Sequence, residues 1–450
     1  MNTSFFGELL QTISERGRAL LERTRERRGD AAARSHGLVE LCEELLSGRG
    51  EASGAALARE IFIRYDELTT GPRIAFFEAL ATRFGVDRER IDAAVDAWAR
   101  DGNDEAAIEL HLASEPRRQE LFRRLNLAPG GTAALVSMRE DLMDAMAHRD
   151  DLSPVDQDFV HLFSSWFNRG FLVLRRIDWS TPAIILEKII RYEAVHQIQD
   201  WDDLRRRIDP PDRRCYAFFH PALVDEPLIF VEVALTSGIP RAIAPILGNN
   251  GSALRPESAN TAVFYSISNC QRGLSGVSFG SFLIKQVVEE ISREFPRLST
   301  FVTLSPAPGF AAWLARERES NNPILLPEDL AELSELDKPN WWQDGAAERL
   351  QEPLLHAAAT YFLSARSGTG GALDPVARFH LGNGARLEQL NPFGDLSEKG
   401  IAQSHGLMVN YRYDVDEIEK NHEAYAENRT IVTVNGIRKR ARAARELAKA

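Results

Sequence analysis

Cysteine is scarce in this chain, with only Cys42, Cys215 and Cys270 among 450 residues. Three scattered cysteines make neither a disulfide framework nor the paired spacing of a zinc site, so they fit a reducing cytoplasm. Apolar runs are short, and none approaches the ~20 residues that a membrane-spanning helix needs. The first residues, Met1–Glu8, lack the basic-then-apolar order of a secretion signal. We therefore expect a cytoplasmic protein with no membrane anchor.

Positive charge is also in deficit, since 54 Lys and Arg residues face 66 Asp and Glu residues, for a net charge of −12. A protein that binds nucleic acid or an anionic membrane surface usually carries a basic excess. The sequence therefore predicts neither kind of partner. Attraction of an anionic ligand would depend on individual arginines.

Several catalytic signatures are missing. The chain has no H-E-x-x-H pair, no Cys/His cluster and no facial-triad spacing, so we expect no metal. It has no G-x-S-x-G elbow of an α/β-hydrolase, no P-loop and no G-x-G-x-x-G dinucleotide loop. These absences exclude several common classes of enzyme.

The most informative stretch is a strand, a glycine-rich turn and a helix. Residues 261–268 are β-branched and aromatic, which favours a strand, and apolar residues at helical spacing follow in 281–291. Between them the turn contains Gln271, Arg272, Gly273, Gly276 and Gly280. Such a turn brings backbone N–H groups to a helix N-terminus, where a phosphate or pyrophosphate binds. An ordinary connection whose glycines only permit tight packing remains the alternative.

The first 115 residues read as successive helices rich in Ala, Leu, Glu and Arg. The predicted helices are Phe5–Arg27, Leu38–Leu46, Ala55–Tyr65, Arg73–Phe84 and Arg88–Arg100. Helical patterns continue at Ser137–Arg149 and Gln157–Asn168, so the domain boundary lies between about 115 and 170. We divide the chain into a helical self-association domain, 1–115, and a catalytic domain, 116–450. His36 and His111 are packing or surface residues in this interpretation.

After Asp200 the pattern becomes that of a mixed α/β domain. The predicted strands are Cys215–His220, Leu228–Thr236, Thr261–Ser268, Thr300–Leu304, Arg378–Leu381 and Leu407–Tyr413. Residues 315–350 read as a polar, loop-rich insertion, and the tail from Ile437 reads as a solvated helix. The predicted fold class is therefore α+β, an all-helical domain followed by a mixed α/β domain.

Two further segments contain candidate catalytic groups. Glu226-Pro227 begins an apolar strand, and is either a rigid strand-entry turn or the place of a carboxylate that orients another catalytic group. His380 lies in a predicted strand just before Gly382-Asn383-Gly384. A strand histidine is more often a hydrogen-bonded core residue, but a position beside a turn favours catalysis.

Taken in order, several motifs resemble the malonyl-CoA decarboxylase family over residues 116–415. They are Arg213-Arg-Cys-Tyr216, Glu226-Pro-Leu, Val233-Ala-Leu-Thr236, Phe264-Tyr-Ser-Ile-Ser268, Gln271-Arg-Gly-Leu, Gly280-Ser-Phe-Leu-Ile-Lys285, Leu304-Ser-Pro-Ala-Pro-Gly-Phe310, Asn383-Gly-Ala385 and Gly406-Leu-Met-Val-Asn-Tyr-Arg-Tyr413. The resemblance implies a helical oligomerisation domain and an acetyltransferase-like (GNAT) catalytic domain. It also implies conversion of malonyl-CoA to acetyl-CoA and CO₂ in fatty acid metabolism, without metal or organic cofactor, by a homo-oligomer that the resemblance suggests is a tetramer.

The resemblance also implies site residues. The family's histidine falls on His380 as proton donor, its glutamate on Glu226 and its tyrosine on Tyr413. Its serine falls on Ser252, with Ser258 as the alternative because the length of the loop varies. The substrate-binding stretch falls on Leu223, Val224, Asp225, Glu226, Pro227, Leu228 and Ile229, and the coenzyme A pyrophosphate on the turn containing Gly273, Gly276 and Gly280.

Two other classes of protein use a similar coenzyme A site. One is an acyltransferase of the GNAT type, and the other is a non-catalytic acyl-CoA-binding protein. Product analysis with malonyl-CoA alone distinguishes the three, because only a decarboxylase forms acetyl-CoA and CO₂ without an acceptor.

Overall fold

Helix-forming sequence gives way to strand-forming sequence near residue 170, and a computed structural model of the chain divides there into two units. The structure describes residues 37–47, 51–248, 253–277, 283–321, 323–343 and 346–447. The first unit runs to Leu172 and also includes His220–Val224 and Gln271–Ser278, and the rest of the chain forms the second. Helices continue past residue 115, and the unit ends near the far limit of the interval in which we placed the boundary.

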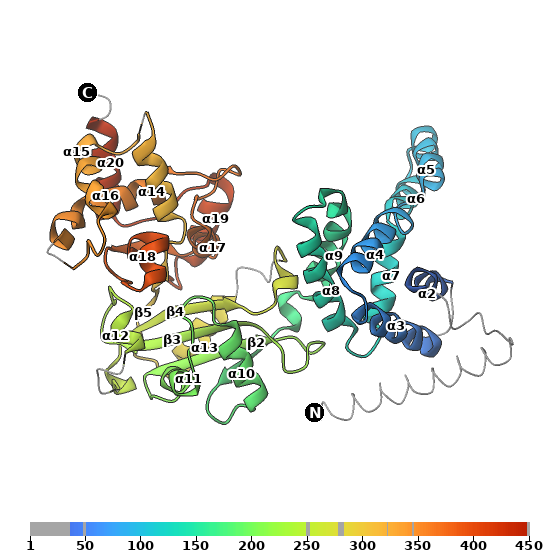
Figure 1. The fold of residues 1–450 in the computed structure, drawn as a ribbon, viewed down its shortest axis with the longest axis horizontal. Coiled ribbons are helices and arrows are strands. Elements are labelled where there is room, and N and C mark those ends of the chain that lie inside the picture. The colour runs from blue at the N-terminus through green and yellow to red at the C-terminus, as the bar shows by residue number, and fades with distance from the viewer. Residues whose placement is uncertain are drawn as a thin grey trace. The chain divides into compact units, whose positions relative to one another are not determined.

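Up to Leu172 the described part of the first unit consists of helices and their connections (Figure 1). Its helices are α2 (Leu38–Leu46), α3 (Glu51–Asp66), α4 (Thr70–Thr82), α5 (Arg88–Asp101), α6 (Asp104–Ser114), α7 (Arg117–Asn126), α8 (Gly131–Met146) and α9 (Ser153–Trp166). The predicted helices from Leu38 onward are confirmed, whereas Phe5–Arg27 lies outside the described residues. Asp87 and Asn103 cap α5 and α6 by accepting backbone N–H bonds in the first turn.

The second unit is built on one mixed sheet. Its strands are β1 (Val173–Ile177), β2 (Arg213–Phe219), β3 (Pro227–Thr236), β4 (Thr261–Asn269), β5 (Thr300–Thr303), β6 (Ser305–Pro306), β7 (Arg386–Asn391) and β8 (Met408–Arg412). The order is β1-β2-β3-β4-β5-β8-β6, with β7 also paired to β8. Every pairing between these strands is antiparallel except that of β4 with β5. The predicted α+β class is therefore confirmed.

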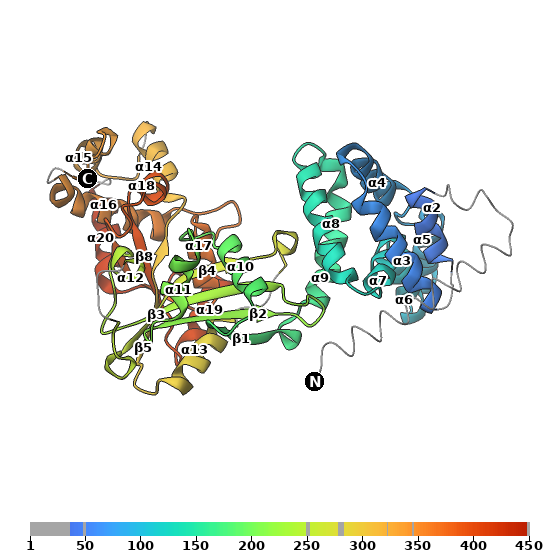
Figure 2. The same cartoon turned by 60° about the horizontal axis from the view of Figure 1, so that its bottom comes forward.

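Helices cover both faces of the strands β1 to β3 (Figure 2). On one face α10 (Ala183–Tyr192) and α11 (Trp201–Ile208) bury Ile189 and Leu204 against Cys215, Ala217 and Phe230. The alternate residues of β2 point the other way, so Arg214 reaches Glu294 of α13 (Leu283–Glu294), with 2.6 Å between Nη2 and the carboxylate oxygen.

The C-terminal helices, orange and red in Figure 1, belong to the same unit. They are α14 (Phe310–Glu319), α15 (Pro327–Leu333), α16 (Ala346–Ser364), α17 (Pro375–Gly382), α18 (Glu398–Ser404), α19 (Ile418–Asn428) and α20 (Asn435–Leu447), and the short α12 (Ala244–Leu247) lies earlier in the chain. Both α16 and α17 contact β7. The loop-rich insertion predicted at 315–350 is thus partly helical.

One predicted strand is wrong. Residues Arg378–Leu381 belong to α17, because Asp374 and Pro375 start a helix that the local strand-like composition does not reveal. The Asp374 Oδ1 atom accepts the Ala377 N–H at 2.9 Å, and Pro375 occupies the first turn, where its missing N–H costs nothing. His380 consequently lies near the end of a helix. No described helix is long and apolar enough to span a membrane.

Candidate functional site

The one parallel pair of strands separates partway along its length. Residues Thr261–Phe264 of β4 pair with Thr300–Thr303 of β5, and the last bond joins the Leu304 N–H to the Phe264 carbonyl at 2.9 Å. Beyond this point β4 continues beside β3 to Asn269. The segment that follows β5 instead forms β6, which pairs with β8. A register shift in the β3–β4 ladder coincides with the separation, since Glu232 pairs with Ser266 but Val233 pairs with Phe264. Such a bulge bends a strand locally.

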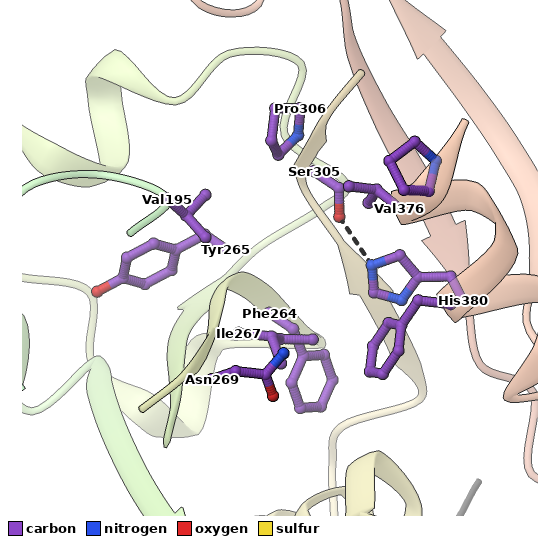
Figure 3. A pocket seen from close by; sticks show the side chains of 11 residues that line it. Val195, Phe264, Tyr265, Ile267, Asn269, Ser305, Pro306, Val376 and His380 are labelled. Atoms are coloured by element: carbon purple, nitrogen blue, oxygen red, sulfur yellow. Dashed lines mark hydrogen bonds between the residues drawn. The ribbon is translucent and has the colours of Figure 1, made fainter. Parts of the chain in front are cut away.

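A cavity of about 250 Å³ lies where these strands separate (Figure 3). Its wall is mainly apolar, and among the described residues that line it none is Lys, Arg, Asp or Glu. The lining residues are Val195, Phe264, Tyr265, Ile267, Asn269, Ser305, Pro306, Pro375, Val376, Phe379 and His380. A mostly apolar cavity with a few polar groups is the usual form of a small-molecule site.

His380 and Ser305 are the polar pair in this cavity. The imidazole Nε2 lies 3.1 Å from the Ser305 Oγ, and Figure 3 shows the two side chains facing one another. On its other side Nδ1 lies 2.8 Å from the Tyr413 hydroxyl, and the ring of Tyr411 stacks on the imidazole at 4.7 Å between centroids. Only 3% of His380 is exposed. The ring is therefore held at both nitrogens and on one face.

The hydrogen bonds around the imidazole assign its tautomer. The Ser305 hydroxyl donates to the Thr303 Oγ1 at 2.9 Å, so the Ser305 oxygen is left to accept from Nε2–H. The Tyr413 hydroxyl then donates to Nδ1. Burial lowers the pKa of His380 to about 3, because a charged imidazolium is poorly solvated there. At neutral pH the ring is uncharged and carries its proton on Nε2.

The lowered pKa predicts a loss of stability in acid. An unfolded histidine has a pKa near 6.5, so between pH 6.5 and about 3 the unfolded chain binds a proton that folded His380 does not. Acid therefore favours unfolding, and His380 alone should reduce the free energy of unfolding by about 2 kcal/mol from pH 7 to pH 5. Urea titrations at both pH values should show that the free energy of unfolding falls less from pH 7 to pH 5 in His380→Asn than in the unaltered protein, by about 2 kcal/mol. Equal reductions in the two proteins would contradict the assignment.

The wall residue Val195 is held by a buried carboxylate. Glu193 accepts the Val195 N–H at 2.8 Å and the His196 N–H at 2.7 Å. The same carboxylate accepts the hydroxyls of Ser266 and Ser268 at 2.7 and 3.1 Å. The two serines of the Ser266-Ile-Ser268 motif thus fix a loop that forms one side of the cavity.

Ser305 is a candidate that sequence reasoning missed. It is separated from His380 by 75 residues and becomes its neighbour only when β6 and α17 pack together. The one signal in the sequence was a serine-proline pair directly after a predicted strand, within the motif Leu304-Ser-Pro-Ala-Pro-Gly-Phe310. Ends of strands often carry functional groups.

Of the two serines named from the sequence, only Ser258 is among the described residues. Ser252 is outside the described residues, but Leu254, two positions later, donates its N–H to Asp212 just before β2. Ser258 is exposed and precedes β4 at Thr261, whereas the cavity begins at Phe264 and extends to Asn269 at the other end of that strand. The structure does not bring Ser258 to His380.

Glu226 does not line the cavity and pairs with a lysine instead. Its carboxylate lies 2.6 Å from the Nζ of Lys188, which also donates to the Asp225 carbonyl at 3.0 Å. Asp225 has φ of +55°, in the left-handed region that suits a turn. Of the neighbouring predicted residues, Leu223, Leu228 and Ile229 are buried, Val224 is 69% exposed, and Pro227 starts β3.

The glycine-rich turn makes close contacts with α8. A Cβ on Gly273 would lie 2.1 Å from the Val136 carbonyl oxygen, so only glycine fits there. The Gly273 N–H donates to Glu140 at 3.0 Å, and Arg272 forms an exposed ion pair with Asp144. Gly276 has φ of +80°, a turn conformation that favours glycine. A Cβ at this position would meet no atom within 4 Å, so the conformation and not the space explains the glycine. Gln271 is the first residue of this turn, and Gly280 lies outside the described residues.

No group of three or more His, Cys, Asp or Glu side chains suited to a metal occurs among the described residues. The polar groups that line the cavity are the neutral imidazole of His380 and the side chains of Ser305, Tyr265 and Asn269, and the rest of the wall is apolar.

Comparisons with known proteins all point to one family, and the family models match residues 84–167 and 170–450. The model of the malonyl-CoA decarboxylase C-terminal domain matches residues 170–450, and that of the N-terminal domain matches residues 84–167. The mitochondrial malonyl-CoA decarboxylase of Anser anser anser is 37% identical over 404 residues, covering 81% of this chain and 79% of that protein. The protein of the same name from Rattus norvegicus is 36% identical, covering 78% of each chain.

Solved structures give the same result. The crystal structure of malonyl-CoA decarboxylase from Rhodopseudomonas palustris has 59% identity and a TM-score of 0.86, covering 89% of this chain and 98% of that one. The structure from Agrobacterium vitis has 55% identity and a TM-score of 0.86, covering 90% and 99%. The chain belongs to the malonyl-CoA decarboxylase family.

Proposed function

We propose that this protein is a malonyl-CoA decarboxylase, a carboxy-lyase that converts malonyl-CoA to acetyl-CoA and CO₂. The observation that carries the proposal is the Ser305–His380 pair, joined at 3.1 Å in an apolar cavity, in a chain of this family. The reaction breaks the bond between Cα and the carboxylate, leaves the electron pair as an enolate of the thioester, and then adds one proton to Cα.

The cavity wall suits the first step. A malonyl carboxylate placed between Phe264, Val376 and Phe379 would meet no cationic side chain among the described lining residues. Burying an unpaired charge is unfavourable, and departure of neutral CO₂ removes that charge from the carboxyl carbon. The apolar wall therefore favours cleavage over retention of the carboxylate.

The polar pair suits the second step. In the substrate complex the Ser305 hydroxyl would turn away from the Thr303 Oγ1 and donate to the thioester oxygen, on which the negative charge of the enolate develops. The Nε2–H of His380 would then protonate Cα. The imidazolate left by this transfer would be stabilised by the Tyr413 hydroxyl, 2.8 Å from Nδ1, until Nε2 regains a proton. Each turnover consumes one proton, which must return to the site from solvent. We propose that no metal or organic cofactor takes part, because these side chains supply every step.

Roles for the other residues suggested by the resemblance remain part of the proposal. Glu226, held by Lys188, would balance charge at the start of β3. By the resemblance, the residues Leu223–Ile229 and the turn Gln271–Gly276 would contact the coenzyme A portion. Ser252 would act in place of Ser305 if the resemblance holds at that position. The three thiols are free and buried, which supports a cytoplasmic location.

Product analysis with malonyl-CoA tests the function. Acetyl-CoA and CO₂ should appear in equal amounts without an acceptor and after dialysis against a strong chelator. Dependence on an amine or alcohol acceptor would indicate an acyltransferase, and absence of any product would indicate a binding protein.

Exposed apolar side chains on α5 and α6 support self-association as a homo-oligomer. Val95 and Trp98 share one face of α5, and Ile108 and Leu112 share one face of α6, with 43–60% of each residue exposed. Isolated exposed apolar residues are common, but four of them on two helices that contact each other favour an interface. We propose that copies of the chain associate through this α5–α6 surface, as a tetramer in keeping with the family.

Disrupting this surface should reduce the mass in solution. The double substitution Trp98→Glu, Ile108→Glu places two charges on the α5–α6 surface, so light scattering should report a smaller assembly that retains turnover. Val415→Glu, at a residue that is 53% exposed in the second unit, is the matched control and should leave the mass unchanged. An unaltered mass in the double variant would contradict the assignment of the surface.

A further inference from the structure

The two members of the polar pair lie on separate segments that need a common support. Ser305 is in β6, at the start of the short segment that reaches Gly309 and α14, whereas His380 lies in the last turn of α17. A bond of 3.1 Å between side chains on two such segments is maintained only if the segments are fixed relative to each other. One buried carboxylate links both of them.

That carboxylate is Asp374, which is 1% exposed. Its Oδ1 accepts the Ala377 N–H at 2.9 Å and so begins the helix that carries His380. Its Oδ2 accepts the Gly309 N–H at 3.5 Å, at the end of the segment that carries Ser305. The Tyr361 hydroxyl of α16 donates to the same oxygen at 3.2 Å.

Gly309 fits this arrangement for a steric reason. A Cβ at this position would lie 2.6 Å from the Tyr361 hydroxyl and 3.8 Å from the Asp374 Oδ2. Its φ of −93° is open to any residue, so backbone conformation does not require glycine here. Glycine is required at this position because Tyr361 and Asp374 approach the backbone closely.

We infer that Asp374 is a positioning residue, which holds Ser305 and His380 at hydrogen-bonding distance by joining the start of α17 to the Ser305–Gly309 segment. The inference rests on the proposed function of the Ser305–His380 pair. Asp374 itself does not line the cavity, so it acts through the geometry of the pair. Misplacing a reacting group by about 1 Å costs on the order of 10²-fold in rate.

The substitution Asp374→Asn tests the link with little change in shape. An asparagine has one accepting oxygen, so it can cap α17 or accept from Gly309 and Tyr361, but it cannot do both. We expect kcat for malonyl-CoA to fall by about 10–100-fold while KM changes by less than about threefold. Asp200→Ala is the matched control. It removes the cap of α11, where the Asp200 Oδ1 accepts the Asp203 N–H at 2.7 Å, and should lower the melting temperature without changing kcat.

A double-mutant cycle separates positioning from general stability. If Asp374 acts through the pair, Asp374→Asn introduced into Ser305→Ala should reduce kcat by less than about threefold further. Tyr361→Phe is a milder change that removes one of the three hydrogen bonds to Asp374. Its effect on kcat should be smaller and should likewise be lost in Ser305→Ala. This variant replaces Asp374→Asn in the cycle if Asp374→Asn does not fold.

The outcomes separate the inference from the proposed function. The positioning role would be overturned, and the proposed function left intact, by either of two results. One is that the losses of kcat are additive in both cycles. The other is that kcat is unchanged in Asp374→Asn while His380→Asn is inactive. Full turnover of malonyl-CoA by His380→Asn would instead overturn the catalytic pair on which the inference rests.

Discussion

Replacing His380 with Asn should lower kcat for malonyl-CoA by about 10²–10⁴-fold, the usual contribution of a general acid–base group. Asn retains a polar side chain near Ser305 but has no proton to transfer at this pH. Binding of acetyl-CoA, measured by calorimetry, should change little, because the cavity wall is otherwise intact. The variant therefore separates the chemical step from binding.

His405→Asn is the matched control for this substitution. Burial lowers the pKa of His405 to about 4, as burial does for His380, but His405 lies after α18 and does not line the cavity. Its φ of +49° is a conformation that Asn tolerates well. The control should therefore fold and turn over normally. Full turnover by His380→Asn would contradict a catalytic role and show that His380 only packs in the core.

The second large effect is expected at Ser305. Ser305→Ala removes the hydroxyl that faces Nε2, and loss of one donor to a developing oxyanion typically costs about 10²–10³-fold in kcat. The alanine fits the space of the serine, so the melting temperature should change little. Steady-state kinetics with malonyl-CoA measure the loss.

Ser252→Ala and Ser258→Ala provide the comparison. The family resemblance assigns the catalytic serine to Ser252, whereas the hydrogen bond at 3.1 Å favours Ser305. Ser258 lies before β4, at the other end of the strand from the cavity, and its variant should be fully active. If Ser252→Ala is the inactive variant and Ser305→Ala turns over normally, the bond between Ser305 and His380 is structural and the resemblance identifies the better serine.

Local pattern was sufficient for much of the fold. β-branched and aromatic runs predicted β2, β3, β4, β5 and β8 close to their observed bounds, because the strands in the middle of the sheet are buried on both faces. Helical spacing predicted α2 and α5 in the same way. The five-residue β1 was not predicted, since an edge strand with exposed Arg175 and Arg176 has little apolar pattern.

The site was predictable only where the family resemblance reached it. The resemblance named His380 and Tyr413, which the structure brings within 2.8 Å, but the local sequence placed His380 in a strand. The cap formed by Asp374 and Pro375 outweighs the strand preference of Arg378–Leu381, and its strength depends on burial. Ser305 could not be found by spacing, because its distance to His380 is set by the packing of β6 against α17.

The glycine-rich turn shows the same limit. Three glycines before a helix indicate either a phosphate loop or a close packing contact, and sequence alone does not choose between them. At Gly273 the contact with Val136 explains the glycine fully. At Gly276 the positive φ explains the glycine.

The most direct test of the central claim is the mass spectrum of the products formed from malonyl-CoA as sole substrate in D₂O. Formation and protonation of an enolate predict one CO₂ for each acetyl-CoA, and a methyl group with one more deuterium than the Cα of the remaining malonyl-CoA. Release of free coenzyme A, or malonyl-CoA that stays unconsumed, would contradict decarboxylation in this cavity.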